Sequence, residues 1–267
     1  MDKTIGSLSK DDIQSLYDEY NLHIFDGEVK ENEGIIVILD VIGWQNFANP
    51  QFVDNYFQMI NRLRTELLTI CKRSSAGNEL KPNIRVVSMS DTIIVLINGE
   101  RPYCDLNIFG HISKFITESL QAGIMFRGLI NYGKYYTNTL DNAFIGETYY
   151  ETVKSAEKTE WAGVILTDNL SRRLLSKFSI EELKALHIIR YEDIPFKGIT
   201  PTVEKLVLTP FRDMKIMVDR GERIFFDFKK RYGELMNDGK KLKNTIRFFD
   251  YLEKNFWNAN GGTVEFV

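Results

Sequence analysis

The chain has 267 residues, of which 43% are hydrophobic and 27% charged, and its formal net charge is −3. This composition is that of a globular protein with enough apolar residues for a substantial core, and the charge balance excludes a general nucleic-acid binder. No apolar run approaches the length of a membrane span, and residues 1–7 lack the apolar core of a signal peptide. We therefore expect a cytoplasmic protein that contacts neither membrane nor nucleic acid.

The first half of the chain begins with a short predicted helix and a strongly apolar strand. Residues 9–22 have the spacing of a helix, with Ser9 at the N-cap position. Residues 35–42 are apolar and mostly β-branched apart from Asp40, which is typical of a central strand buried on both faces. Apolar residues then recur every three or four positions over 52–73, so we expect a long amphipathic helix there.

A predicted hairpin comes next and is followed by alternating helices and strands. The β-rich runs 83–89 and 92–98 are separated only by Ser90 and Asp91, which predicts a tight turn with the acid near its tip. The remaining pattern predicts, in order, a helix over 104–122, a strand over 124–132, a short strand over 143–146, a helix over 147–160 and a strand over 163–167. This order predicts an α+β fold, a ferredoxin-like βαββαβ sheet that carries its helices mainly on one face.

The chain changes character after Pro210, where strand-like runs stop. Aromatic-rich patterns predict helices over 214–236 and 240–257, joined by a turn-forming Asn-Asp-Gly sequence. We expect these helices to form an appendage that serves as a dimerisation or partner surface. The predicted organisation is a lead-in with the N-terminal helix at 1–34, a main domain at 35–209 and a C-terminal helical extension at 210–267.

A pair of acids, Asp40 and Asp91, is the strongest chemical signal, because the cysteines and histidines are too scattered for a zinc site or a histidine-based hydrolase. A lone acid at a strand end is most often a turn or cap residue, but a strand lying beside the hairpin would bring these two together. Two carboxylates repel each other unless cations neutralise them, and Mg²⁺ or Mn²⁺ prefers oxygen ligands together with substrate phosphates. The pair therefore predicts two divalent ions and a nucleoside triphosphate, with backbone groups of Val41, Ile42 and Gly43 at the phosphates.

Four motifs follow one another between residues 35 and 170. They are Leu39-Asp-Val-Ile-Gly-Trp44, Ser88-Met-Ser-Asp-Thr92, Phe126-Arg-Gly-Leu-Ile-Asn-Tyr-Gly133, and Ile145-Gly-Glu-Thr-Tyr-Tyr-Glu-Thr-Val-Lys154 with the strand 163–167 after it. In this order they resemble the Asp-Ile-x-Gly-Phe motif, the Gly-Asp hairpin, the Arg-x-Gly-x-x-x-Gly strand and the Gly-Asp-x-Val-Asn-x-x-x-Arg helix of class III nucleotidyl cyclases, the adenylate and guanylate cyclase family.

The resemblance implies both a site and a reaction. Asp40 and Asp91 would be the metal ligands, assisted by the Val41 carbonyl, and two subunits would meet head to tail to form shared active sites. In that family the 3′-hydroxyl attacks the α-phosphate of the nucleotide, which gives a 3′,5′-cyclic nucleotide and pyrophosphate. Because the chain has one such domain, a homodimer is the simplest assembly.

The chain departs from the family pattern at several positions. Tyr150 and Lys154 stand where the family places its transition-state Asn and Arg, and lysine supplies a point charge without the bidentate fork of arginine. Val87 and Ala143 align with the purine-selecting lysine and the adenine-selecting acid, and neither can bind a base by a side-chain hydrogen bond. Arg127 has two interpretations, since it can hold a phosphate or tie its strand to a helix.

These departures leave two functions open. In the first, the protein is an active cyclase whose pocket is narrowed toward the pyrimidines UTP and CTP by Trp44 and Phe47. Cyclases resembling this family that make cyclic UMP or cyclic CMP in bacterial antiphage signalling are the precedent. In the second, it is a catalytically inactive domain that binds a nucleotide or a protein partner. The presence of both aspartates among apolar strands favours the first.

Overall fold

The computed structural model describes residues 29–43, 50–74, 83–98, 102–122, 124–138, 144–198, 203–209, 239–252 and 254–255. The helices predicted over 9–22 and 214–236 lie outside these residues, as do the predicted site residues Trp44, Phe47 and Ala143.

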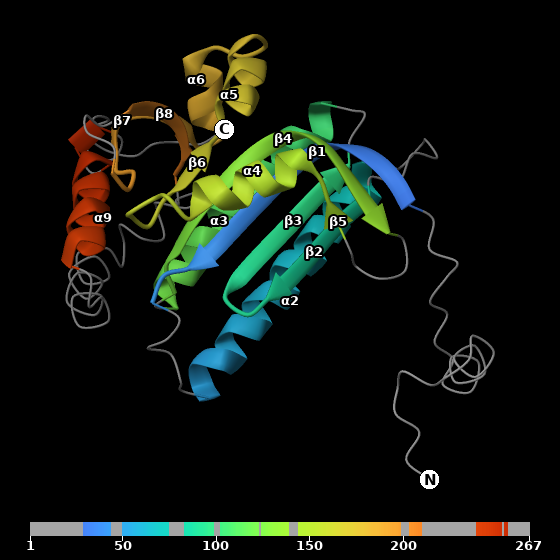
Figure 1. The fold of residues 1–267 in the computed structure, drawn as a ribbon, viewed down its shortest axis with the longest axis horizontal. Helices are drawn as coiled ribbons and strands as arrows, with labels where there is room; N and C mark the ends of the chain where they lie inside the picture. Colours follow the sequence, from blue (N-terminus) through green and yellow to red (C-terminus); the bar gives the residue numbers. More distant parts are fainter. Residues whose placement is uncertain are drawn as a thin grey trace, which may run out of the picture.

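Strands and helices alternate through most of the described chain (Figure 1). The strands are β1 (Val29–Val41), β2 (Asn83–Met89), β3 (Thr92–Asn98), β4 (Phe126–Asn138), β5 (Phe144–Ile145), β6 (Val164–Leu166), β7 (Ile188–Ile194) and β8 (Val203–Leu208). The helices are α2 (Pro50–Ser74), α3 (Pro102–Gln121), α4 (Glu147–Ala156), α5 (Asp168–Leu175), α6 (Ile180–Ala185) and α9 (Gly239–Leu252). The two strands of the hairpin have the bounds that the sequence predicts, and the helices α2 and α3 begin and end within two residues of their predicted positions.

The described strands form one sheet in the order β2-β3-β1-β4-β6-β8-β7, with β5 paired to β4. Strand β1 lies between β3 and β4 and is antiparallel to both. Its residues Ile35 to Leu39 are each exposed by 2% or less, because both faces of the strand are covered. The apolar run that predicts a central strand therefore forms one. Strand β1 ends at Val41, directly after Asp40.

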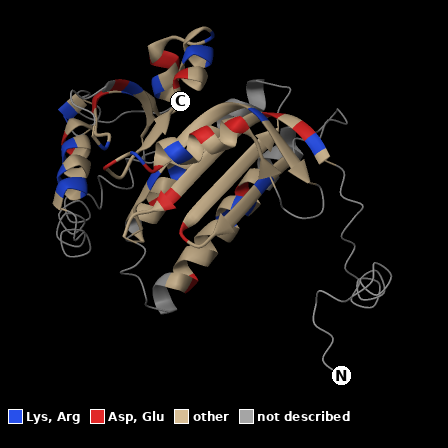
Figure 2. Cartoon of the chain, viewed as in Figure 1, with Lys and Arg blue, Asp and Glu red and all other residues tan. Residues whose placement is uncertain are grey.

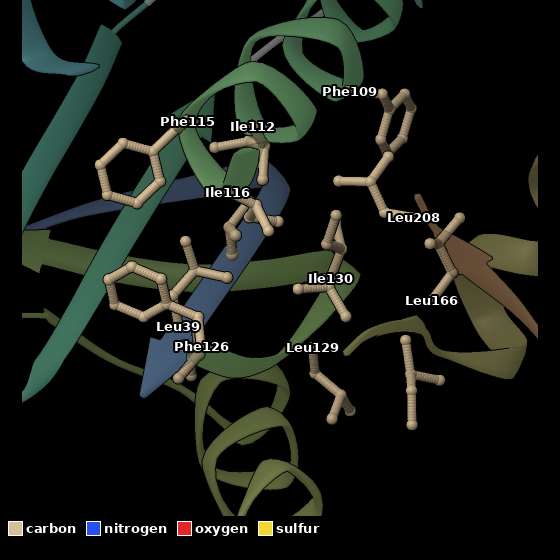
Figure 3. Close-up of a cluster of buried hydrophobic side chains, with 14 of the residues drawn as sticks. Leu39, Phe109, Ile112, Phe115, Ile116, Phe126, Leu129, Ile130, Leu166 and Leu208 are labelled. Atoms are coloured by element: carbon tan, nitrogen blue, oxygen red, sulfur yellow. The ribbon is translucent and has the colours of Figure 1, made fainter. Parts of the chain in front are cut away.

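Helices α2 and α3 cover one face of the sheet and the shorter helix α4 crosses the other (Figure 1). On the first face, the rings of Phe115 in α3 and Phe126 in β4 lie 5.4 Å apart. Figure 3 shows the side chains of α3 packed over Leu39 and Ile130, whereas Leu129 points to the opposite side. The two long helices on one face agree with the predicted α+β sheet.

Four elements between Asp168 and Leu208 were not predicted. The antiparallel pair β7 and β8 continues the sheet beyond β6, and α5 and α6 lie before it. Both helices have N-caps that the sequence could have revealed, since the Thr167 side chain accepts from the Leu170 amide and Ser179 forms a capping box with Glu182.

Helix α9 packs against the far end of the sheet through aromatic residues. The Phe248 ring lies 4.5 Å from that of Trp161 and 4.9 Å from that of Tyr191 in β7. The Thr245 hydroxyl also accepts a hydrogen bond from the Ala162 amide, at 2.9 Å. Among the described helices, none has the length and apolar character needed to cross a bilayer.

Candidate functional site

Asp40 lies next to the end of β1 and faces side chains from both neighbouring strands. Its cross-strand partners in the sheet are Thr92 of β3 and Arg127 of β4. The Thr92 hydroxyl donates to one carboxylate oxygen, Oδ1, at 3.3 Å. The other oxygen, Oδ2, accepts from Arg127 Nε at 2.7 Å and lies 2.6 Å from Arg127 Nη2. The antiparallel register thus places an acid, a hydroxyl and a guanidinium on one face of the sheet.

Arg127 also reaches the helix that crosses this face. Its Nη1 atom donates to the Glu157 carbonyl, just after the end of α4, at 3.5 Å. Of the two roles that the sequence left open, the structure contains the contact from strand to helix, together with an ion pair to Asp40 that the sequence did not predict.

Asp91 lies in the turn between β2 and β3, beside the end of β1. The Val41 amide donates to the Asp91 carbonyl at 2.9 Å, which ties the two segments together. The residue before it, Ser90, has a φ of +55°, and its carbonyl accepts from the buried Tyr56 hydroxyl at 3.4 Å. The end of β1 and this turn both appear in red at the same end of the sheet in Figure 2. Asp40 and Asp91 therefore lie at the same corner of the sheet, close enough for the charge of one to affect the other.

The electrostatics of this corner are dominated by burial. Desolvation raises the pKa of Asp40 above its usual value, and the charge of Asp91 raises it further. Arg127 and the Thr92 hydroxyl act in the opposite direction, but the net shift of the pKa remains upward. Burial, with the charges of Asp91 and Asp40, also raises the pKa of Tyr56, so that its hydroxyl stays protonated and able to donate.

The donor set at this corner fits a hard cation. Among the described residues, no group of three or more His, Cys, Asp or Glu side chains is placed to hold a metal ion, and this corner has two carboxylates, those of Asp40 and Asp91. Burial, more than the neighbouring charge of Asp91, raises the pKa of Asp40, and the ion pair with Arg127 offsets only part of that effect. A cation bound by Asp40 and Asp91 would favour the charged form of both acids, and Mg²⁺ and Mn²⁺ commonly bind to one or two carboxylates.

The backbone after Asp40 is less open to phosphates than the sequence suggests. The amides of Val41 and Ile42 already donate to the carbonyls of Asp91 and Met125, each at 2.9 Å. Gly43 follows with a φ of +77°, a left-handed conformation that glycine adopts freely. Its amide donates no hydrogen bond within the described part of the chain, which makes Gly43 the best placed of the three for an anion.

The other predicted site residues are spread over α4 and β2. Tyr150 is 62% exposed on α4, and Lys154 Nζ lies 5.6 Å from the centre of its ring, where a cation is attracted to the aromatic face. Val87 is half-buried in β2, paired with Ile94. Tyr150 and Lys154 are both exposed on α4, and neither is among the groups that shift the pKa of Asp40 within one subunit.

Three residues of this corner were missed in the sequence, namely Tyr56, Ser90 and Thr92. Thr92 follows the predicted ligand and begins a strand beside β1, so register alone could have found it. Tyr56 has the helical spacing of a core residue, and nothing in the sequence distinguishes it from one.

No protein-family model and no curated protein matches the chain. Among solved structures, it resembles the adenylyl cyclase CyaB from P. aeruginosa, with 12% identity and a TM-score of 0.45 over 69% of this chain and 97% of that one. It also resembles the adenylate/guanylate cyclase/hydrolase from Silicibacter pomeroyi, with 12% identity and a TM-score of 0.44 over 68% and 99% of the two chains. A third is the catalytic core of a rhodopsin-guanylyl cyclase with converted specificity, in complex with ATPαS, with 16% identity and a TM-score of 0.41 over 68% and 98%.

Proposed function

We propose that this chain is a divergent class III nucleotidyl cyclase that converts a nucleoside triphosphate to a 3′,5′-cyclic mononucleotide and pyrophosphate as a homodimer. The observation that carries the proposal is the meeting of Asp40 and Asp91 at neighbouring strand ends, where Asp40 keeps a raised pKa despite its ion pair with Arg127. Two partly buried carboxylates at one corner are suited to divalent cations that arrive with a triphosphate.

Asp40 and Asp91 would hold the Mg²⁺ or Mn²⁺ ions, two per site, with the Val41 carbonyl as a further oxygen ligand. When bound, such ions activate an attacking hydroxyl and stabilise a leaving pyrophosphate. The Gly43 amide lies beside the ligands and can donate to a phosphate oxygen. Arg127 keeps Asp40 oriented, and its guanidinium adds positive charge at the edge where the triphosphate would lie.

Helix α4 supplies groups that suit a site shared between subunits. Tyr150 and Lys154 are exposed on the face of the sheet that carries Asp40, as expected of residues that reach across a dimer interface. Lys154 would stabilise charge developing on the phosphates as a point charge, which is weaker support than a bidentate arginine gives. We therefore expect slow turnover.

The choice of nucleotide base depends on whether the site has side chains that can hydrogen-bond to a purine. Val87 is half-buried and apolar, so it cannot select a purine by hydrogen bonding. A pocket narrowed by Trp44 and Phe47 would favour UTP or CTP, and Ala143 adds no acid that could bind adenine. A role of the product in antiphage signalling stays a prediction.

The decisive experiment incubates the purified full chain with Mn²⁺ and each of the four nucleoside triphosphates, and measures pyrophosphate and cyclic nucleotide. We expect one or both pyrimidine nucleotides to be cyclised, and Asp40→Ala or Asp91→Ala to abolish the product. Glu204→Ala is the matched control. Glu204 is a half-exposed carboxylate in a surface ion pair with Arg190, and it lies in β8, three strands away from β1.

The alternative function, a catalytically inactive nucleotide-binding or protein-interaction module, is favoured by one observation, the presence of Tyr150 and Lys154 in place of the transition-state pair. Metal-dependent nucleotide binding without any product would support that module and contradict the cyclase. Absence of both binding and product would leave Asp40 and Asp91 as structural residues.

A further inference from the structure

The turn that carries Asp91 is held in a conformation that its sequence disfavours. Ser90 has a φ of +55°, in the left-handed region where a Cβ atom is crowded and only glycine is at ease. In the family that the sequence resembles, the hairpin has glycine before its aspartate. Some other contact must therefore keep Ser90 in place and, with it, the carboxylate that follows.

Helix α2 provides such a contact from beneath the turn. The Tyr56 side chain is 1% exposed, and its hydroxyl donates to the Ser90 carbonyl at 3.4 Å. One residue further on, the Asp91 carbonyl accepts from the Val41 amide of β1 at 2.9 Å. The peptide units on both sides of the Asp91 side chain are thus fixed, one by α2 and one by β1.

We propose that Tyr56 is a positioning residue, whose hydroxyl holds the strained turn at Ser90 so that the Asp91 carboxylate stays beside Asp40. This inference rests on the proposed function, since it assigns Tyr56 to the same cation site. Tyr56 acts through the turn, and its ring position depends on packing that phenylalanine would preserve. The hydroxyl alone is therefore the group to test.

The test uses the full chain with Tyr56→Phe, Ser90→Gly and the double variant. Losing one hydrogen bond to the turn should weaken the binding of Mn²⁺ alone by about two- to tenfold in Tyr56→Phe. Ser90→Gly should restore affinity in the double variant, because glycine adopts the left-handed conformation without the hydroxyl's support. A general packing defect would not be rescued by a glycine in the turn.

Tyr191→Phe is the matched control, since Tyr191 is also buried, at 2% exposed, but lies in β7 against Trp161. Hydrogen–deuterium exchange over residues 84–97 supplies a second readout that needs no ligand. We expect faster exchange at the hairpin in Tyr56→Phe, normal exchange in the double variant and no change in Tyr191→Phe.

The outcomes separate this inference from the proposed function. If the unmodified chain binds Mn²⁺ and Tyr56→Phe changes neither affinity nor exchange, the inference is wrong and the proposed function stands. If the unmodified chain binds neither Mn²⁺ nor a nucleotide, the proposed function is wrong, and Tyr56 is reduced to a structural contact whatever the exchange shows. Weaker binding and faster exchange that Ser90→Gly reverses would support both.

Discussion

At the scale of single residues, the surroundings of Asp40 have opposing effects on its pKa. Burial disfavours its charged form, while Arg127 and Thr92 favour it, and the balance leaves the pKa of Asp40 above its usual value. A partly buried carboxylate with a raised pKa does not stabilise the fold, because a neutral residue of the same shape would cost less to bury at this apolar strand end. A cation bound there, as we propose, would favour the charged form of Asp40.

The raised pKa of Asp40 predicts that the free energy of unfolding depends on pH. A raised folded-state pKa means that the stability associated with protonated Asp40 is present below the ordinary pKa and is lost as the pH rises through the raised value. Asparagine stays neutral throughout. The free energy of unfolding of Asp40→Asn, relative to the unmodified protein, should therefore increase between about pH 3 and about pH 7, as measured by urea unfolding with a chelator present.

Glu66 is the matched control because its shift has the opposite sign. Burial raises the pKa of Glu66, but hydrogen bonds from Lys114 and His111 outweigh it, and the net shift is downward. The relative stability of Glu66→Gln should accordingly decrease over the same pH range. A parallel trend in the two variants would contradict the electrostatic account of Asp40.

The ion pair between Arg127 and Asp40 should be energetically coupled. Their side chains are exposed by 17% and 18%, so solvent screens the pair only in part. We expect a double-mutant cycle with Arg127→Gln and Asp40→Asn to give a coupling free energy of about 1 to 2 kcal/mol. The pair Arg190–Glu204, exposed by 50% and 46%, should give less than about 1 kcal/mol by the same thermal-unfolding measurement. Equal coupling in the two pairs would argue against a partly desolvated site.

The sequence shows why some of these residues could be predicted and others could not. Asp40 and Asp91 stand out because an acid in an apolar strand needs a reason, and strand order brings the two together. The contact between Arg127 and Asp40 depends on the register between β1 and β4, which no local pattern determines. Tyr56 contributes one hydroxyl from a face that otherwise packs as core.

At the scale of elements, α4 is fixed closely to β4. The Asn131 side chain donates to the Thr152 hydroxyl of α4 at 3.0 Å and accepts from the Tyr132 amide and the Thr167 hydroxyl. Each of these groups is at least partly removed from water, so losing one partner leaves a costly unpaired polar atom. Helix α4 therefore presents Tyr150 and Lys154 from a defined position.

Glycine at position 133 should be required for the close packing of α4 against β4. A Cβ atom at Gly133 would lie 2.5 Å from Thr148 Oγ1 and 2.9 Å from its Cγ2 atom. Gly133→Ala should therefore lower the free energy of unfolding by about 1 to 3 kcal/mol, as overpacking does. Adding Thr148→Ala should recover most of the loss in chemical unfolding, because it removes both contacted atoms. An unchanged stability of Gly133→Ala would show that α4 can shift without cost, and a loss that Thr148→Ala does not recover would show that it does not come from contact with Thr148.

The elements were predictable where one hydrophobic period ran long enough. The run at 35–42 and the helix pattern at 52–73 are of this kind, and the structure follows both. Between 168 and 208 the helices have only eight and six residues, and the two strands mix charged residues with their apolar ones, so neither kind of element shows a clear period. Helix α9 begins at Gly239, within one residue of its predicted start, and residues 253, 256 and 257 of the predicted helix lie outside the described residues.

At the scale of the whole molecule, the face of the sheet that carries Asp40 also carries exposed apolar side chains. Met89 is 55% exposed and pairs with Thr92, the partner of Asp40, so it emerges on that face. Helix α4, with Tyr150, packs there through Asn131, and Ile145, 72% exposed, lies just before it. Apolar residues gathered near a proposed shared site are typical of an interface between subunits.

We therefore expect this face to form a twofold homodimer whose loss removes activity without unfolding the chain. Ile145→Glu and Met89→Glu would place charges into the interface, so sedimentation analysis should show monomers and nucleotide turnover should fall at least tenfold, with an unchanged melting temperature. Leu175→Glu is the matched control, because Leu175 is also exposed, at 39%, but lies on α5. An unmodified chain that sediments as a monomer yet turns over nucleotide would contradict the shared site. Equal dissociation by Leu175→Glu would place the interface elsewhere. Loss of dimer and activity together in the first two variants would show that Met89 and Ile145 lie in an interface that the activity requires.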